Sequence, residues 1–282
     1  MSGFTCLTLL GTGSSGGVPR ANGDWGHCDP ENTKNRRRRC SALLERAASR
    51  EAYYSGDKVT RIVIDTAPDF REQMLSAQVP RLDGVVFTHD HADQTHGVDD
   101  LRAFALLQRQ RIPVWMDEAT RATLMTRFGY AFTSPEASIY PAILDARDMP
   151  EPGSPLTIEG PGGDLNVTPF LQEHGRIMSL GFLSAGIAYS ADISALPEPS
   201  ADIIRNVECW AVDALRDEPH PTHFSVGDAL SAIETVDAKR AVLTNLHITL
   251  DYDALSRRLP KQVVCGYDGL KVINDQGEVS IN

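Results

Sequence analysis

The feature that most constrains this chain is the run His89-Asp90-His91-Ala92-Asp93, which directly follows the apolar residues 84–88. A continuous apolar run of this length is typical of a strand that is buried on both faces of a sheet. In extended backbone, residues two apart share a face, so the imidazoles of His89 and His91 can reach one ion. Asp93 lies two residues further on, where the chain turns toward a helix. The pattern therefore favours a metal site at a strand end of an open α/β sheet, where the sites of such proteins usually lie.

Apolar segments and segments of helical periodicity alternate along the whole chain, with no internal repeat and no linker. This order indicates one α/β domain over residues 1–282. Residues 145–164 are rich in proline, glycine and acid and are predicted to be mostly loop. The predicted strands are residues 4–10, 41–45, 61–65, 84–88, 113–116, 165–170, 180–183, 187–190, 208–213 and 241–244. The predicted helices are residues 98–110, 118–128, 226–235 and a short last one capped by Asp251.

Three further side chains that can bind metal follow predicted strands at long intervals. They are His174, Asp192 and His247. A lone histidine after a strand is more often structural than a ligand. Three such residues, each just after a strand, are better explained by a single metal site that they share with the histidine run.

The spacing His89-x-His91-x-Asp93-x-x-x-Gly97, followed by the single His, Asp and His above, resembles the metallo-β-lactamase superfamily. The resemblance covers nearly the whole chain, from Gly11-Thr12-Gly13 to Tyr267-Asp268-Gly269. It implies an α/β fold of one particular type, a four-layer αββα sandwich with a two-metal site between the sheets. It also implies that Asp65 is the buried acid that orients the histidine loop.

The resemblance further implies a complete set of metal ligands. Three histidines would bind a first ion, an aspartate and a histidine a second, and one aspartate would bridge the two. In this sequence the first set is His89, His91 and His174, the second is Asp93 and His247, and the bridge is Asp192. The expected metal is Zn²⁺, as one or two ions, with Mn²⁺ as the alternative.

One position departs from the superfamily pattern. The residue after Asp93, a histidine ligand of the second ion in the family, is Gln94 in this chain. Its amide oxygen is a weaker zinc ligand than imidazole, and His96, two positions further along a helix, points to a different side. We therefore expect a second ion that is weakly held, prefers a harder metal or is absent. Gln94→His should strengthen its binding.

Within the superfamily, the opening loop, the arginines before Cys40 and the segment 220–225 most resemble the phosphonate-pathway cyclic phosphodiesterases (PhnP-type), and more distantly the tRNA 3′-end nucleases. This resemblance implies that His223 lies beside the substrate phosphate and donates a proton to the leaving alkoxide. Asp213 would orient that imidazole, and Asp93 would orient the attacking hydroxide as well as bind metal. Because a metal ion lowers the pKa of bound water to about 7, hydroxide would be available at neutral pH.

Two features have both a structural and a functional interpretation. The glycine-rich residues 11–17 can bind phosphate through backbone N–H groups or form a plain turn, and no GKS/T follows that would make them a P-loop. Arg36-Arg37-Arg38-Arg39 can bind substrate phosphate or lie on a solvated face. The remaining histidines, interpreted as surface or structural residues, are His27, His96 and His220.

The five cysteines are scattered without framework spacing. An odd number of this kind indicates a reducing, cytoplasmic environment. The phosphonate-pathway enzymes carry an extra zinc held by three cysteines and a late histidine. That ion is not predicted here, because the stretch around Cys28 lacks the cysteine spacing and Leu250 stands in place of the histidine.

These observations predict a metal-dependent phosphodiesterase acting on a small cyclic ribose phosphate or a nucleotide. A tRNA 3′-processing ribonuclease is the second hypothesis, disfavoured because the net charge is −11 and residues 145–164 are acidic. A catalytically weak nucleotide-binding scaffold, and a lactonase or thioesterase of the same fold, stay open because metal ligands alone do not choose the chemistry. The expected partner is a small phosphorylated substrate, without a membrane or a nucleic acid, and a homodimer is compatible with the sequence.

Overall fold

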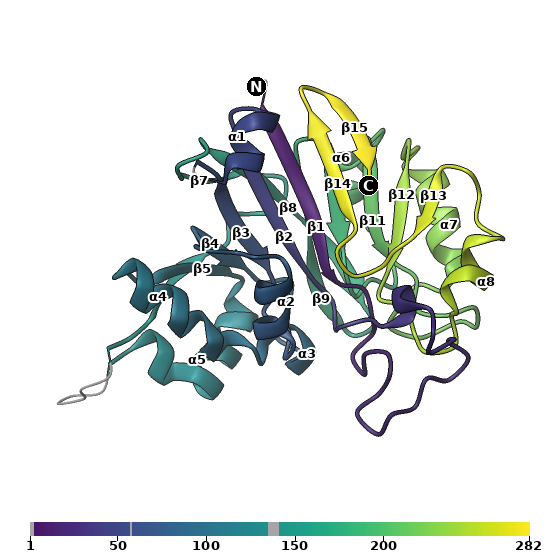
Figure 1. Ribbon diagram of the computed structural model, residues 1–282, viewed down its shortest axis with the longest axis horizontal. Helices are drawn as coiled ribbons and strands as arrows, with labels where there is room; N and C mark the ends of the chain where they lie inside the picture. Colours follow the sequence, from purple (N-terminus) through teal and green to yellow (C-terminus); the bar gives the residue numbers. More distant parts are fainter. Residues whose placement is uncertain (1–2, 57, 135–140) are drawn as a thin grey trace.

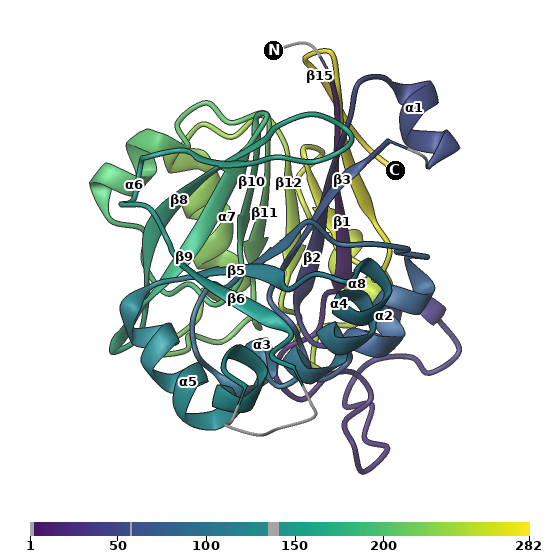
Figure 2. The same ribbon diagram turned by 90° about the vertical axis from the view of Figure 1, so that its left-hand side faces the viewer.

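The computed structural model describes residues 3–56, 58–134 and 141–282. Two β-sheets lie face to face, with helices on the outer sides (Figure 1 and Figure 2). The strand order is β15-β14-β1-β2-β3-β4-β5-β6 in the first sheet and β13-β12-β11-β10-β9-β8-β7 in the second. This architecture confirms the αββα sandwich that the sequence predicted.

The first sheet combines antiparallel and parallel strands. β1 pairs antiparallel with β14 and β2, whereas β3, β4, β5 and β6 are parallel neighbours. Because parallel strands end at the same edge, Asp65 after β3 and the histidine run after β4 lie at one edge of this sheet. The bounds are β1 Phe4–Gly11, β2 Ser41–Ala47, β3 Thr60–Ile64, β4 Gly84–Val86, β5 Ile112–Met116, β6 Leu144–Asp148, β14 Lys271–Asp275 and β15 Glu278–Ile281.

The second sheet is antiparallel at one side and parallel at the other. β7, β8, β9 and β10 pair antiparallel in that order, and β10, β11, β12 and β13 pair parallel. The parallel strands again end at one edge, which carries Asp192, Asp213 and Asn245. The bounds are β7 Leu156–Ile158, β8 Leu165–His174, β9 Ile177–Ser184, β10 Ile187–Ser190, β11 Cys209–Asp213, β12 Ala241–Thr244 and β13 Val263–Cys265.

Side-chain alternation along the strands produces three apolar layers. In β3, Ile62 and Ile64 pack between the two sheets, whereas Val63 packs against the outer helices. The helices α2, α4 and α5 cover the first sheet, and α6, α7 and α8 cover the second. The helix bounds are η1 Thr33–Asn35, α1 Arg50–Ser55, α2 Phe70–Ser76, α3 Ala92–Thr95, η2 Val98–Leu101, α4 Arg102–Gln108, α5 Glu118–Phe132, α6 Glu198–Ile203, α7 Val226–Thr235 and α8 Tyr252–Ser256.

Several predicted elements differ from the structure in their extent. The predicted helix 98–110 is a 3₁₀ turn, η2, followed by α4, and the helix predicted to end at residue 128 continues to Phe132. Residues 145–164 are mostly loop, but most of β6 and all of β7 lie within them. β6 is the last strand of its sheet and is polar, so it lacks an apolar pattern.

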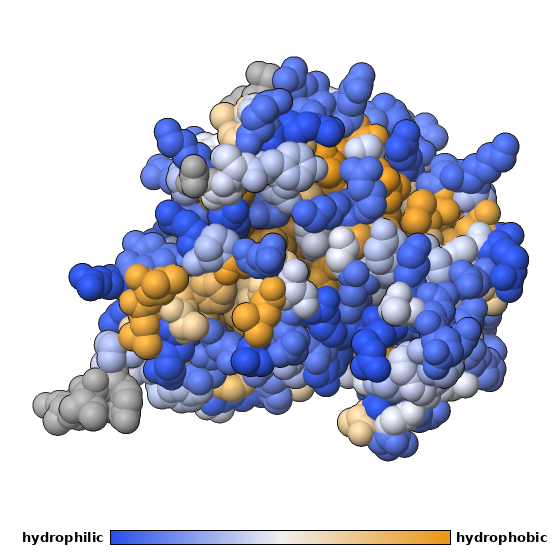
Figure 3. Space-filling view, viewed as in Figure 1, coloured by the Kyte–Doolittle hydropathy of each residue, from blue (hydrophilic) through white to orange (hydrophobic). Residues whose placement is uncertain are grey.

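The surface seen in Figure 3 is largely polar, with apolar side chains gathered over α4. Leu106 and Leu107 of α4 are exposed. None of the helices in the described part of the chain has both the length and the apolar character needed to cross a bilayer.

Candidate metal centre

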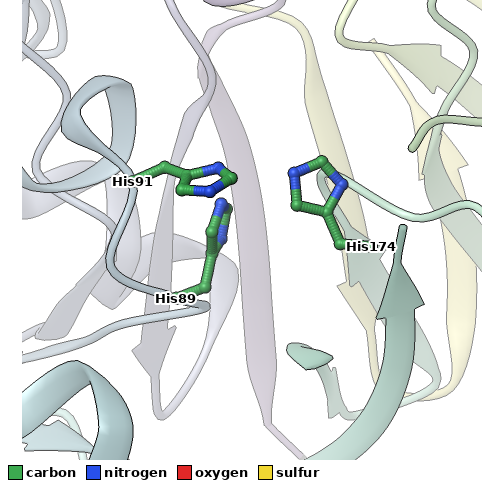
Figure 4. A group of neighbouring side chains, drawn as sticks. All are labelled: His89, His91 and His174. Atoms are coloured by element: carbon green, nitrogen blue, oxygen red, sulfur yellow. The ribbon is translucent and has the colours of Figure 1, made fainter. Parts of the chain in front are cut away.

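Three histidines from both sheets meet where the strands end. His89 and His91 follow β4, and His174 is the last residue of β8. Figure 4 shows their imidazoles close together around a common space. The ring centroids are 4.5 Å apart for His89 and His91 and 5.1 Å apart for each of these with His174. One ring nitrogen of each lies within 4.8 Å of those of the other two, and we call this set the three-histidine group.

A chain of hydrogen bonds fixes the ring of His89. Thr88 donates its backbone N–H to Asp65 Oδ1 and its hydroxyl to Oδ2, each at 2.8 Å. Since the only hydroxyl proton is used, Thr88 Oγ1 accepts from His89 Nδ1, 2.9 Å away. Nε2 of His89 therefore carries a lone pair, and it is buried without a hydrogen-bond partner among the described residues. Asp65 thus orients the histidine loop through Thr88.

The ring of His174 is fixed in the same sense. Its Nδ1 lies 2.6 Å from the backbone carbonyl oxygen of Thr222, which can only accept, so Nδ1 carries the proton and Nε2 the lone pair. Burial lowers the pKa of both His174 and His89, which favours neutral imidazoles. Three neutral imidazoles fit one Zn²⁺ and leave a fourth tetrahedral position open, the pattern of catalytic zinc sites.

The histidine loop itself is held against β3 by Gly97. Its N–H donates to the carbonyl of Thr66 at 2.8 Å. A Cβ at this position would lie 2.2 Å from the carbonyl oxygen of Ala67, so only glycine allows the close approach. This explains the glycine of the His-x-His-x-Asp-x-x-x-Gly spacing.

Asp192 and His223 form a second group with His174, again with ligand atoms within 4.8 Å of one another. Both carboxylate oxygens of Asp192 accept hydrogen bonds from buried amides. Gln94 Nε2 donates to Oδ2 at 2.7 Å, and Asn245 Nδ2 donates to Oδ1 at 3.2 Å. The bridging role predicted for Asp192 would therefore compete with two amide donors.

Three residues of the site have a left-handed backbone conformation. The φ angles are +62° for Asp65, +53° for Asp192 and +60° for Asn245. Each residue lies within two positions of a strand end. Aspartate and asparagine adopt this conformation more readily than most residues, and such strained positions concentrate at functional sites.

His223 and Asp213 form the pair that the sequence predicted. His223 Nδ1 donates to Asp213 Oδ2 at 2.7 Å, which leaves Nε2 free to act on a substrate. Burial acts to lower the pKa of His223, but the hydrogen bond and charge of Asp213, with the charges of Asp192 and Asp93, raise it to about 9. The imidazole can therefore carry a proton at neutral pH.

His247 follows β12, as predicted, and both of its ring nitrogens have hydrogen-bond partners in the protein. Its Nε2 lies 2.7 Å from Arg20 Nη2, and its Nδ1 lies 3.1 Å from Thr249 Oγ1. Since a guanidinium only donates, Nε2 uses its lone pair to accept from Arg20. Within the described ranges, neither His247 nor Asp93 belongs to a compact group of three ligand atoms. The second ion predicted at Asp93 and His247 stays a prediction, and it would require His247 Nε2 to release Arg20.

A cleft of about 830 Å³ opens beside the three-histidine group. Asp93 lines it, and burial together with the charge of Asp192 raises the pKa of Asp93 to about 6. Arg176 adds a cation to the wall, and Ile177 and Pro221 add apolar surface. The cleft can therefore receive a molecule with both an anionic and an organic part.

The four consecutive arginines have structural partners and do not line this cleft. Arg39 binds the carboxylate of Asp69 through two nitrogens, at 2.7 and 2.6 Å, and Arg38 binds Asp268 at 3.0 Å. Arg36 is exposed and lies over the ring of Trp25.

Arg37 is the buried member of this arginine run. Its guanidinium donates to the carbonyl oxygen of Leu250 at 2.8 Å and to Asn35 Oδ1 at 3.3 Å, and it lies 3.7 Å from Cys28 Sγ. It thereby ties the segment around residues 28–37 to the loop that follows His247. All four arginines line a separate cavity of about 640 Å³, so the phosphate-binding interpretation of the run does not apply to the cleft beside the three-histidine group.

Most backbone N–H groups of the glycine-rich loop are also used internally. Thr12 donates to Asp268, Gly13 to Arg38, Ser14 to Leu246 and Gly17 to Ser14. Among the described residues, no acceptor is recorded for the N–H groups of Ser15 and Gly16, which are both exposed, and Ser15 lines the cleft. The loop is thus mainly a structural turn, in which the N–H groups of Ser15 and Gly16 are exposed to solvent.

The other histidines lie outside the three-histidine group. His27 and His96 are exposed, and the ring of His96 packs edge-on against Phe128. His220 is half-buried, with its ring centroid 5.2 Å from that of His223.

Sequence reasoning missed the residues that support the ligands, Thr88, Thr222, Asn245 and Arg20. The one usable signal was Asn245, an asparagine directly after a strand. The roles of Thr222 and Arg20 depend on contacts between segments far apart in the chain.

The sequence matches the family described as "Beta-lactamase superfamily domain" over residues 60–248, which is more than half of the chain. The structure is similar to the crystal structure of "a New Diphosphatase from the PhnP Family", with 29% identity, a TM-score of 0.81 and coverage of 95% of this chain and 96% of that one. It is also similar to Zn²⁺-bound PqqB from Methylobacterium extorquens, with 16% identity, a TM-score of 0.68 and coverage of 94% and 99%. The second likeness shows the fold alone.

Among curated proteins, the chain is 29% identical over 284 residues to a protein named octanoyltransferase from Porphyromonas gingivalis. The match covers 97% of this chain but only 52% of that protein, so the chain spans about half the length of this relative. Its name describes the whole longer protein. With the αββα fold, the strand-end histidines and the family match over most of the chain taken together, this protein belongs to the metallo-β-lactamase superfamily.

Proposed function

We propose that this protein is a metal-dependent hydrolase of phosphate esters or anhydrides in a small molecule, such as a nucleotide or a cyclic ribose phosphate. The observation that carries the proposal is the position of the His223–Asp213 pair beside the three-histidine group. His174 belongs both to that group and to the set that contains His223. An ion and a proton donor would therefore act on the same phosphorus centre.

His89, His91 and His174 would hold the ion, for which the unpartnered Nε2 of His89 is an open ligand position. When bound, a zinc ion lowers the pKa of water to about 7 and polarises a phosphoryl oxygen. The protein supplies the remaining functions with its own groups.

Two residues of the chain would handle the proton and the attacking water. His223 Nε2 is free because Nδ1 donates to Asp213, so it can donate a proton to the leaving oxygen or a hydrogen bond to the phosphate. The carboxylate of Asp93 lines the same cleft, where it can accept a hydrogen bond from the attacking water. An in-line displacement needs the water-orienting group and the acid on opposite sides of the phosphorus, and both residues line the cleft that would hold it.

The size and chemistry of the cleft favour a small substrate. Its volume of about 830 Å³ is within the range of small-molecule sites, and Ile177 and Pro221 offer apolar contact to a base or another organic group. The similarity to a PhnP-family diphosphatase supports phosphoanhydrides as well as phosphodiesters. Tight RNA binding depends on many contacts between basic side chains and phosphates. The net charge of −11 therefore argues against an RNA substrate. Octanoyl transfer is not proposed for this chain, because the chain matches only 52% of the protein named octanoyltransferase.

Hydrolysis by the full chain, loaded with Zn²⁺ or Mn²⁺, tests the proposal. The panel comprises adenosine diphosphate, a nucleoside 2′,3′-cyclic phosphate, bis(p-nitrophenyl) phosphate, a lactone and a tRNA precursor. We expect turnover of at least one small phosphate substrate and loss of that turnover on chelation. Preference for the lactone or the tRNA precursor would contradict the proposal.

A further inference from the structure

Arg20 forms a hydrogen bond with His247, the histidine that the sequence analysis expected to bind a second metal ion. Its Nη2 is 2.7 Å from His247 Nε2, and this is its only side-chain hydrogen bond among the described residues. The side chain is otherwise exposed. Four of the five N–H donors of the guanidinium are thus open to a ligand.

The neighbouring loop presents backbone donors beside this arginine. A Cβ on Gly16 would lie 3.5 Å from Arg20 Nε, so the guanidinium packs directly against the backbone of Gly16. The N–H groups of Ser15 and Gly16 have no recorded acceptor in the described chain, and Ser15 lines the cleft. Two successive backbone amides and a guanidinium, next to the point where Ser15 enters the cleft, form a typical anion-binding arrangement.

A second metal ion beside Asp192 and His247 would compete with hydrogen bonds that the protein makes. Gln94 and Asn245 donate amide N–H groups to both oxygens of Asp192, and His247 accepts from Arg20. Each oxygen of Asp192 keeps a further lone pair, and Gln94 Oε1 is buried without a hydrogen-bond partner among the described residues. His247 Nε2, by contrast, has its single lone pair taken by Arg20 and could bind an ion only after releasing it. The positive charge on this side comes from Arg20 instead.

We propose that Arg20, with the N–H groups of Ser15 and Gly16, forms a phosphate-binding subsite that takes the place of a second metal ion. This subsite binds the non-reacting phosphate of a substrate with two phosphate groups. The proposal rests on the proposed function for the identity of the substrate, but it makes a separate claim about binding. The two claims can therefore fail independently.

The test compares binding of adenosine 5′-(α,β-methylene)diphosphate, whose P–C–P bridge is not hydrolysed, with binding of adenosine monophosphate to the zinc-loaded full chain by calorimetry. The two ligands differ by one phosphate, so the ratio of their affinities measures the subsite. Arg20→Ala should reduce this ratio by about 10–100-fold, the effect of losing a hydrogen bond to a charged group worth roughly 1.5–3 kcal/mol. Arg20→Lys should retain part of the ratio, because lysine keeps the charge but loses the planar fork of donors.

Arg36→Ala is the matched control. Arg36 is an exposed arginine of the same N-terminal segment, and it lies over Trp25 and not in the cleft. This variant should leave the affinity ratio at the wild-type value. Elemental analysis should give the same zinc content, one ion per chain, in all four proteins.

Three results would overturn the proposal. The first is a wild-type protein that binds the two nucleotides equally well, and the second is an affinity ratio that Arg20→Ala leaves unchanged. The third is a second tightly bound zinc ion in Arg20→Ala, since Arg20 would then only occupy a vacant metal site. If the wild type binds the diphosphate preferentially but hydrolyses none of the phosphate substrates, the subsite stands and the proposed function fails.

Discussion

The three-histidine group and His247 differ in how many of their ring nitrogens are hydrogen-bonded to the protein. In the three-histidine group, His89 and His174 each have one ring nitrogen tied to the protein and the other directed to the common space. In His247, by contrast, both ring nitrogens have protein partners. A single free lone pair on each ring suits a metal ion, whereas a fully bonded ring does not. The difference indicates that the hydrogen bonds of the ring nitrogens, as well as residue type and position, affect how readily a histidine binds metal.

The strongest test of this comparison removes a ligand from the three-histidine group. His91 is exposed, so His91→Ala should fold and yet lose most of its zinc. We expect turnover to fall by more than the roughly 10–100-fold typical for outer-sphere partners of a metal. His96→Ala, an exposed histidine of the same segment, is the matched control and should retain zinc and activity. Full zinc content in His91→Ala would refute the assignment of the first site.

The next largest effect concerns the proton donor. His223→Ala should lower phosphate-ester turnover by about 10²–10⁴-fold, the usual contribution of general acid catalysis, with zinc content unchanged. His220→Ala, its half-buried neighbour, serves as the control. Turnover in His223→Ala within about threefold of the wild type would exclude this role. Loss of zinc together with activity would instead assign His223 to the metal.

A smaller effect should follow from breaking the support of His89. Thr88→Val removes the hydroxyl that connects Asp65 to His89 Nδ1 while keeping the shape of the side chain. Zinc affinity, measured by competition with a chelator, should fall by about 10–100-fold. Thr88→Ser restores the hydroxyl and should recover most of the affinity. Equal affinities in the valine and serine variants would show that the hydroxyl does not orient the ring.

The smallest effect is expected at His247. Gln94→His supplies an imidazole but leaves His247 bonded to Arg20, so it should raise affinity for a second ion only slightly. The double variant Gln94→His, Arg20→Ala should gain more, because the Nε2 lone pair of His247 is then released. Titration of both variants with Zn²⁺ and Mn²⁺ from the chelated state measures the difference. A second site that is equally tight in the wild type and both variants would show that Arg20 and Gln94 do not control it.

The sequence was sufficient to predict the fold and the meeting of His89, His91 and His174, for physical reasons. The buried strand before His89 and the spacing to Gly97 are local patterns, and parallel strands necessarily end at one edge. The ring tautomers could not be predicted, because they depend on Thr222, which is 48 positions from His174. The contact of Arg20 with His247 spans 227 positions and passes through a segment without periodicity. Short edge strands such as β6 were missed because exposure removes their apolar pattern.

The buried guanidinium of Arg37 has a consequence for the way the cleft meets its ligand. It donates to Leu250 and Asn35, so the segment that follows Arg20 and the loop after His247 are held in one arrangement. A ligand that binds between them does not have to order two mobile loops, and little conformational entropy is lost on association. Weak individual contacts at exposed groups such as the Ser15 and Gly16 amides can then contribute more fully to affinity. Preorganisation by one internal arginine thus allows a polar, solvent-open site to discriminate between ligands that differ by a single phosphate.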